Sequence, residues 1–325
     1  MPYAWTRSLT LRHLAASRAP ILVGPWRSEV GFHALYFQPW LAAWRTKYSV
    51  DPDRITVVAP AGSAVWHHPC RPVELFDHLS MTHVRQGLYA ASAQDGTLKQ
   101  NAITAQDRRL LALVASTQGL RRYSILHPSL MYQDLAPWFS GHMPLSDVVH
   151  RLTIPGAHPW PPLSVPVLPL ALVLPEKFVA VKFYGRPTFP LREDIRTWVE
   201  TLVERLSAQI PVVLLESGLD ADDHQDFVIP LSDRVTSTAP HCTVSNHLAL
   251  QSAVLAQAAG FVGTYGGAMQ LALRLGKPSL GFYTEFTGTC YAHKLLAEYL
   301  AVQQGTPCWI GRPGDLDVVK ALGGL

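Results

Sequence analysis

The sequence predicts an α/β protein built from two doubly wound domains, each with a parallel sheet covered by helices. The first observation is length, because 325 residues exceed what one hydrophobic core usually covers. The second is that short apolar runs alternate with segments of helical periodicity in both halves of the chain. The third is a dense run of prolines between Ile154 and Pro175, which interrupts both kinds of regular element and separates the halves.

The first half of the chain starts the alternation. We predict three strands and one helix here: strands over 19–23, 54–60 and 123–126, and a helix over 29–44. Each strand ends at a residue that turns or breaks the chain. We therefore expect residues 1–158 to form the first domain and residues 159–176 to form a proline-rich linker.

The second half, residues 177–325, repeats the pattern and predicts a second doubly wound domain. Its predicted strands cover 178–184, 211–216, 261–264 and 278–283, and its predicted helices cover 191–208, 248–259, 267–275 and 290–300. Ligands of open α/β sheets bind beyond the carboxyl ends of the strands. Two such domains are thus expected to face a cleft that holds their ligands.

The most informative segment runs from Phe261 to Met269, where a predicted strand breaks into three glycines before a helix begins. Glycine lets the backbone approach a bound group closely, and the first amides of the following helix favour an anion such as a diphosphate. We assign a phosphate cradle to five residues here: Gly263, Thr264, Tyr265, Gly266 and Gly267. Thr264 is expected to add a hydroxyl donor. The competing interpretation is a tight strand-to-helix turn with no ligand.

Two cations flank the end of the first predicted strand of the same domain. Lys182 and Arg186 are expected to neutralise phosphate charge near the glycine turn, although solvated charges at a strand end would give the same pattern. Asn246 and Gln251 lie on either side of the start of the helix before the turn, where one can cap that helix and the other can reach the nucleotide.

In the first domain, the turn after the first predicted strand carries Glu29. A carboxylate at this place can accept the proton of an attacking hydroxyl, and the helix dipole would equally favour an acid here without catalysis. His33, one helical turn later, is the reserve candidate for the base. The spacing from Gly24 to Gly31 lacks the dinucleotide fingerprint, which argues against a nicotinamide or flavin enzyme.

Composition excludes several classes of protein. The formal net charge is +3 without a basic stripe, which argues against nucleic acid as a partner. The four cysteines are far apart, and the acids at 220–224 lack a second set of ligands, so we expect no metal. We see no signal-peptide core and no apolar run of about 18 to 20 residues, and we expect a cytoplasmic protein without an integral membrane segment. Neither a hydrolase elbow nor a phosphate-binding NTPase loop is present in the sequence.

Several of these motifs together resemble bacterial glycosyltransferases of the GT-B type, including heptosyltransferase-like and polysaccharide-biosynthesis members. The residues that carry the resemblance are Gly24-Pro25-Trp26 with Glu29-Val30-Gly31-Phe32, Lys182-Phe183-Tyr184, the segment Phe261–Gly267 and Leu275-Gly276-Lys277-Pro278-Ser279. The resemblance implies that the C-terminal domain binds a nucleotide-diphosphate sugar and the N-terminal domain binds the acceptor, without a metal. It also implies that an acid in the first N-terminal loop is the base, which points to Glu29, and that the last helix crosses back to the N-terminal domain.

We therefore expect an inverting, metal-independent transfer of a sugar from a nucleotide-diphosphate sugar to a hydroxyl acceptor, with no separate cofactor. The acceptor would be a carbohydrate, a glycolipid or another hydroxyl compound. Two other functions fit the same motifs: a nucleotide-sugar epimerase of this fold, for which the acids around Asp222 leave room, and a non-catalytic protein that binds sugar nucleotides.

Overall fold

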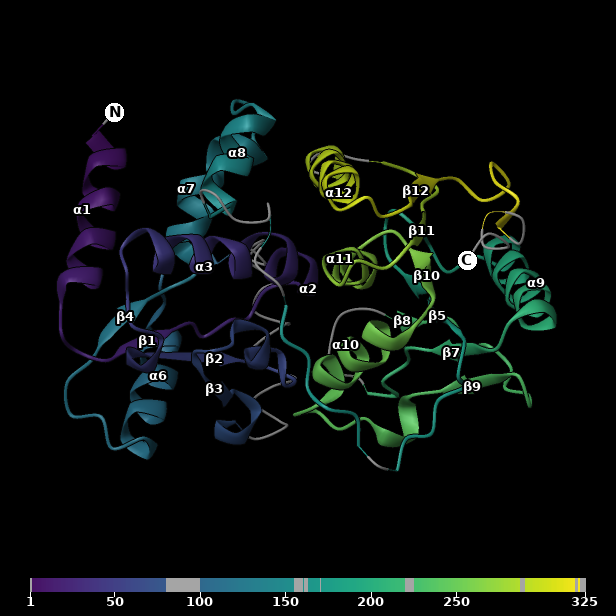
Figure 1. Ribbon diagram of the computed structural model, residues 1–325, viewed down its shortest axis with the longest axis horizontal. Coiled ribbons are helices and arrows are strands. Elements are labelled where there is room, and N and C mark those ends of the chain that lie inside the picture. Colours follow the sequence, from purple (N-terminus) through teal and green to yellow (C-terminus); the bar gives the residue numbers. More distant parts are fainter. Residues whose placement is uncertain are drawn as a thin grey trace. The chain divides into compact units, whose positions relative to one another are not determined.

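The computed structural model describes residues 2–79, 100–154, 160, 163–169, 171–219, 225–286, 290–318 and 321 (Figure 1). Contacts between Cα atoms divide the chain into two compact units. The N-terminal unit comprises Met1–Ser164 with Val244–Asn246, and the C-terminal unit comprises Val165–Thr243 with His247–Leu325. Each unit has its own parallel sheet.

The N-terminal unit is built around four parallel strands in the order β3-β2-β1-β4. The strands are β1 (Ile21–Val23), β2 (Ile55–Ala59), β3 (Arg71–Glu74) and β4 (Ser124–Leu126). The helices are α1 (Pro2–Ala16), α2 (Val30–Phe32), the π-helical η1 (His33–Phe37), α3 (Gln38–Lys47), α6 (Ala105–Thr117), α7 (Ser129–Phe139) and α8 (Leu145–Leu152). Short 3₁₀ turns η2 (Pro52–Arg54), η3 (Ser63–His67) and η4 (Phe76–His78) complete the described elements.

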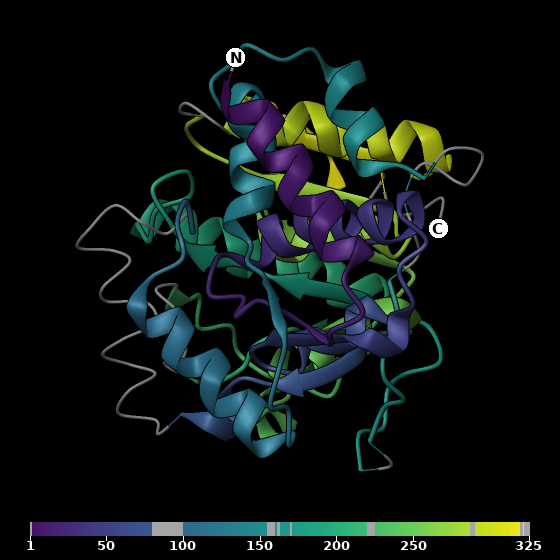
Figure 2. The same ribbon diagram turned by 90° about the vertical axis from the view of Figure 1, so that its left-hand side faces the viewer.

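Helices cover the two sides of this sheet, as a doubly wound fold requires. In Figure 1, α3 and α7 lie on one side of β1 and β2, and α6 lies on the other. Figure 2 shows α1 beside α7, consistent with the contacts between these two helices. Because both faces of the sheet are covered, every residue of β1 and β2 is buried.

The turn after β1 depends on Gly24, whose φ angle of +120° is a conformation that residues with a side chain rarely adopt. A Cβ atom at this position would lie 2.5 Å from the carbonyl oxygen of Val58 in β2. The amide of Gly24 donates to the carbonyl of Leu126 in β4, at 3.0 Å. Gly24 thus fixes where the chain leaves the sheet between its two neighbouring strands.

The C-terminal unit contains six parallel strands in the order β12-β11-β10-β5-β7-β9 and a small antiparallel pair, β6-β8. Its strands are β5 (Val179–Lys182), β6 (Tyr184–Gly185), β7 (Val212–Leu214), β8 (Gln225–Asp226), β9 (Val235–Ser237), β10 (Gly260–Thr264), β11 (Ser279–Phe282) and β12 (Cys308–Gly311). Its helices are α9 (Glu193–Gln209), α10 (His247–Gln257), α11 (Gly267–Arg274) and α12 (Cys290–Gln304), with the 3₁₀ turn η6 (Ala239–His241).

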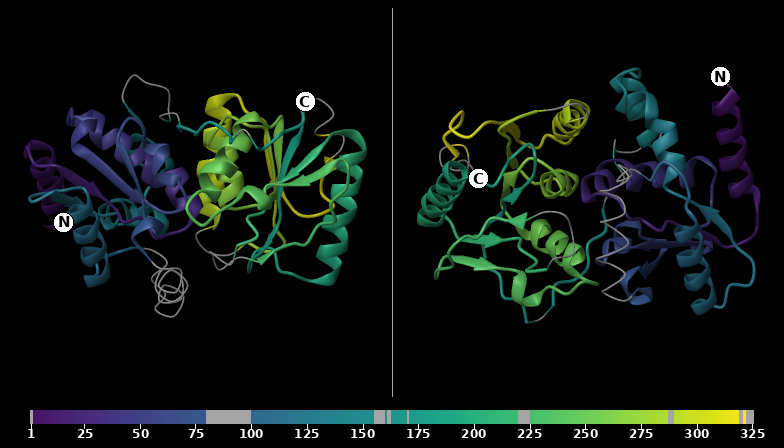
Figure 3. Two further views of the ribbon diagram at one scale, coloured as in Figure 1. Left: turned by 90° about the horizontal axis from the view of Figure 1, so that it is seen from below. Right: turned by 180° about the vertical axis from the view of Figure 1, so that it is seen from behind.

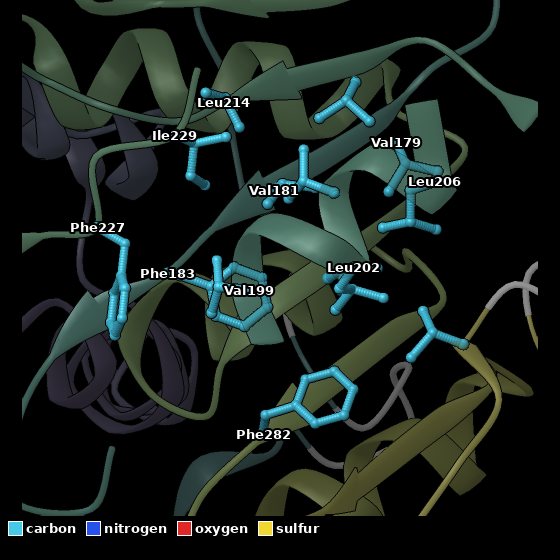
Figure 4. Close-up of a cluster of buried hydrophobic side chains, with 14 of the residues drawn as sticks. Val179, Val181, Phe183, Val199, Leu202, Leu206, Leu214, Phe227, Ile229 and Phe282 are labelled. Carbon is cyan, nitrogen blue, oxygen red and sulfur yellow. The ribbon is translucent and has the colours of Figure 1, made fainter. Parts of the chain in front are cut away.

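The core of this unit forms where α9 packs on the sheet. Apolar residues of α9, including Val199, Leu202 and Leu206, pack against β5 and β7 (Figure 4). In Figure 3, α9 lies on one side of the sheet and α10 and α11 on the other. The sheet is therefore covered on both faces, in keeping with the fully buried strands β7, β10 and β11.

In chain order the six strands of this sheet have the arrangement 3-2-1-4-5-6, which is that of a dinucleotide-binding Rossmann domain. The direction of the winding reverses between β5 and β10. In the N-terminal unit the order 3-2-1-4 reverses in the same way between β1 and β4. The predicted fold class, α/β with two Rossmann-like doubly wound domains, is confirmed for each unit by itself.

The predicted strands and helices correspond to described elements, with ends that differ by a few residues. Three parallel strands, β3, β9 and β12, were not predicted, and each lies at the edge of its sheet. Edge strands bury fewer side chains, so their apolar pattern is weak; β3 even contains Pro72, which a central strand would not tolerate.

We expect Gly24→Ala to lower the free energy of unfolding by about 3 kcal/mol or more, because it adds a steric collision to an unfavourable φ angle. Gly119→Ala is the matched control, since Gly119 has a φ angle of +68° and open space around its Cβ position. That control should cost about 1 kcal/mol. Urea unfolding measures both variants, and equal costs would contradict the role assigned to Val58.

Candidate functional site

The reversal point between β5 and β10 carries the predicted glycine turn. Gly263 pairs with Lys182 across the two strands, and a Cβ atom on Gly263 would collide with the carbonyl oxygen of Lys182. Gly266 has an extended backbone, with φ of 170°, so its lack of a side chain is required by space rather than by conformation. The hydroxyl of Tyr184 occupies the position that a Cβ atom on Gly266 would take.

Helix α11 begins directly after this turn. At the start of the helix, the amide of Gln270 donates a hydrogen bond to the carbonyl of Gly266, at 3.0 Å. The amides of residues 267–269 therefore have no acceptor within the helix itself. Gly267 and Ala268 are partly exposed, so this helix start can reach a bound anion.

The two predicted cations lie on different sides of the reversal point. A terminal nitrogen of Arg186 lies 2.7 Å from the Cβ position of Gly266, so the guanidinium is at the start of α11. Lys182 instead donates its Nζ to the carbonyl of Leu215, at 2.8 Å, and lies 3.6 Å from Asp226. The prediction that Lys182 faces the glycine turn is corrected, because these two acceptors hold its ammonium group at the end of β7.

Two other members of the predicted cradle support the fold around it. The hydroxyl of Thr264 donates to the carbonyl of Tyr184, at 3.1 Å, and accepts from the amide of the same residue, at 3.0 Å. Since Thr264 is fully buried, its expected role as a phosphate donor is corrected to that of a link between β10 and β6. Tyr265 is also buried, and its ring stacks on Phe286 with the centroids 5.4 Å apart.

Asn246 lies in the turn immediately before α10 and is partly exposed. Contacts between Cα atoms group it with the N-terminal unit rather than with the glycine turn. Its predicted contact with a nucleotide stays a prediction. Gln251, on α10, donates to the same carbonyl of Leu215 that binds Lys182, at 3.0 Å, and so supports the end of β7.

Glu216 is the last residue of the predicted strand over 211–216, and the sequence analysis assigned it no role at the site. It follows β7, the second strand of the Rossmann order, where an acid characteristically binds the ribose hydroxyls of a nucleotide. Its carboxylate accepts from the hydroxyl of Ser237 at 2.9 Å. Burial raises its pKa and the nearby charge of Asp226 adds to this, while Ser237 and Lys182 act in the opposite direction. The signal in the sequence was the position of Glu216 at the end of an apolar run; the acids at 220–224 lie outside the described residues.

In the N-terminal unit, Glu29 lies beyond the end of β1, at the reversal point of that sheet. It occupies the N-cap position of α2 with an extended backbone, and its side chain makes no capping hydrogen bond. Glu29 is partly exposed. The pKa of Tyr132 is raised mainly because that tyrosine is buried, and the charge of Glu29 raises it further. Glu29 is thus placed where a doubly wound domain presents groups to a ligand.

Unlike Glu29, His33 is not exposed to solvent. Its prediction as the reserve base is therefore corrected. The side chain is fully buried, and its Nε2 atom is 2.8 Å from Nε2 of His67. Trp26 stacks on its other side, with the ring centroids 4.7 Å apart. Burial, together with the charge that His67 carries when protonated, lowers the pKa of His33 well below its usual value. A histidine enclosed in this way cannot take a proton from a substrate.

No protein-family model matches the sequence, and no curated protein is significantly similar to it. Several solved structures that are similar to the chain are glycosyltransferases. The ADP-heptose lipopolysaccharide heptosyltransferase II of E. coli is 15% identical, with 93% of this chain and 96% of that chain covered and a TM-score of 0.47. A family 9 glycosyltransferase of Veillonella parvula is 11% identical, with 94% and 89% covered and a TM-score of 0.45. The E. coli heptosyltransferase WaaC with ADP is 14% identical, with 94% and 98% covered and a TM-score of 0.42. With TM-scores below 0.5, we draw no conclusion about activity from these structures.

Two further findings apply to the part of the chain that the structure describes. None of its helices combines the length and the apolar character needed to cross a membrane. In the same residues, no group of three or more His, Cys, Asp or Glu side chains is arranged to hold a metal ion.

The buried pair of His33 and His67 gives a prediction for stability. Because the pKa of His33 is lower in the folded than in the unfolded chain, the unfolded chain binds more protons below pH 6.5. Its contribution to stability is therefore present above pH 6.5 and is lost as the pH falls, by up to about 1.4 kcal/mol per pH unit. Denaturant unfolding between pH 7.5 and 5 should show a smaller pH dependence for His33→Phe. His142→Phe, which changes an exposed histidine, should keep the dependence of the original chain.

Proposed function

We propose that the protein is a glycosyltransferase that binds a nucleotide-diphosphate sugar in its C-terminal unit and transfers the sugar to a hydroxyl acceptor. One observation carries the proposal. The start of α11, with the Arg186 guanidinium against Gly266, coincides with the point where the 3-2-1-4-5-6 sheet reverses. This is where such sheets bind nucleotides, and helix amides with a cation beside them suit a diphosphate.

The diphosphate would lie against the amides of residues 267–269 and the Arg186 guanidinium. Negative charge develops on the leaving diphosphate during transfer, and these groups would stabilise it without a metal. Glu216 and Lys182, at the end of β7, would bind the ribose hydroxyls of the same nucleotide. The donor supplies the reactive group, so no separate cofactor is needed.

Glu29 would be the base in this reaction. Its partly exposed carboxylate would accept the proton of the acceptor hydroxyl as that oxygen attacks the anomeric carbon. The bond from the anomeric carbon to the diphosphate breaks as the new glycosidic bond forms, so the configuration at this carbon inverts. A carbohydrate, a glycolipid or another hydroxyl compound would be the acceptor.

Calorimetric titration with UDP, GDP and ADP tests the nucleotide site. We expect one of these to bind, and Arg186→Gln to weaken its binding at least tenfold, because a charge-assisted hydrogen bond is lost. Gly266→Val should abolish binding, since its side chain would displace Tyr184 and Arg186. Gly276→Asn, at the far end of α11, is the control and should bind normally. Unchanged affinity in Arg186→Gln would remove the proposed diphosphate site.

Release of free nucleoside diphosphate from single nucleotide sugars, with candidate acceptors present, tests the reaction. We expect Glu29→Gln to leave the nucleotide dissociation constant unchanged and to lower turnover by about 10² to 10⁴, the usual contribution of a general base. A fully active Glu29→Gln enzyme would refute the assignment of the base. Formation of an epimer would indicate the epimerase, and binding without any product would indicate the non-catalytic protein.

A further inference from the structure

The loop after β1 in the N-terminal unit is held in place at Arg27. The amide of Arg27 donates to the side-chain oxygen of Gln100, at 2.8 Å. The side-chain nitrogen of Gln100 in turn donates to the carbonyl of Pro25, at 2.9 Å. Because Gln100 is buried, these bonds fix the loop at the carboxyl end of β1.

The side chain of Arg27 is fixed as well. Its Nε atom donates to one carboxylate oxygen of Asp107, at 2.7 Å, and Asp107 is fully buried. The other oxygen accepts from the amide of Thr104 at 2.8 Å and from its hydroxyl at 2.7 Å. The same oxygen lies 3.4 Å from Nε2 of His127. Arg27 therefore contacts Asp107 through a single oxygen and a single nitrogen.

The negative charge of Asp107 is compensated by Arg27 through its Nε atom alone, without a bond to the two terminal nitrogens of the guanidinium. Nδ1 of His127 accepts from the amide of Ser129, at 3.1 Å, so the neutral ring can direct its Nε2 proton toward Asp107. Burial alone would raise the pKa of Asp107. The hydrogen bond from His127 and the charge of Arg27 outweigh burial and hold that pKa well below its usual range. Asp107 is thus a buried carboxylate that holds the Nε atom of Arg27 in place.

Within the described residues, neither terminal nitrogen of Arg27 has a hydrogen-bond partner. Only 10% of the side chain is exposed. An arginine that served merely to neutralise a buried acid would gain more from a two-bond contact with both oxygens. The terminal nitrogens of Arg27 are not among the described buried side-chain atoms that lack a partner, so their N–H groups are open to solvent. The arrangement suits a third group that binds from solvent.

We propose that Arg27 forms a binding site for an oxyanion, a phosphate or a carboxylate, at the carboxyl edge of β1 and β4 in the N-terminal unit. The two terminal nitrogens of a guanidinium form a planar fork that matches two oxygens of such a group. Asp107 and Gln100 orient this fork before the ligand arrives. The site stands independently of the proposed function, and in a glycosyltransferase it would select an acceptor that carries an acidic group.

The test uses the full chain with ¹⁵N-labelled arginine, in which the Nε–H signal of Arg27 is identified by its loss in Arg27→Lys. Titration with inorganic phosphate and, separately, with acetate should shift this signal in a saturable way, with a dissociation constant on the order of millimolar. A response to phosphate alone identifies a phosphoryl ligand, and a response to acetate alone identifies a carboxylate. Sodium chloride at the same ionic strength is the control for screening.

A second measurement separates binding from folding. In an Arg186→Gln background, which weakens anion binding by the C-terminal unit, the preferred anion should raise the unfolding temperature. Arg27→Lys should lose most of this rise, because lysine keeps the charge and loses the fork. Arg192→Lys, an exposed arginine paired with Asp194, should keep it.

Absence of a saturable shift of the Arg27 signal with both anions would overturn the inference. So would an Arg27→Lys variant that keeps the full stabilisation by the anion. Neither outcome depends on nucleotide binding, so failure of this inference is distinguishable from failure of the proposed function.

Discussion

The close approach of β5 and β10 is the constraint on which the C-terminal unit depends. Gly263 allows the two strands to pair where a side chain would meet the backbone of Lys182. Just beyond, the Thr264 hydroxyl binds both the amide and the carbonyl of Tyr184. These contacts determine where α11 starts and which side chains lie over its first turn. The proposed diphosphate site is therefore a consequence of how two neighbouring strands are joined.

Both units present their polar groups at the reversal point of a parallel sheet, but they prepare them differently. In the C-terminal unit the backbone supplies the donors, and Arg186 lies over them. In the N-terminal unit side chains do this work, because Gln100 and Asp107 fix the loop that carries Arg27. The first arrangement suits any diphosphate, whereas the second depends on particular side chains and suits a more selective ligand.

Much of the fold could be predicted from the sequence, because the central strands are continuous apolar runs and the glycine turn has a distinctive spacing. The direction of individual side chains could not be predicted. Lys182 turns to the end of β7 because Leu215 and Asp226 lie there, and neither neighbour is visible in a local motif. His33 looked accessible from its helical spacing to Glu29, yet it is enclosed by His67 and Trp26. Likewise, Asp107 is 80 residues from its partner Arg27.

The carbonyl of Leu215 accepts hydrogen bonds from two side chains, Lys182 and Gln251, that come from β5 and α10. A movement of α10 would therefore change how strongly this oxygen holds the lysine ammonium. In the proposed nucleotide site, ligand affinity and the position of α10 would then be thermodynamically linked, even though the helix itself need not touch the ligand.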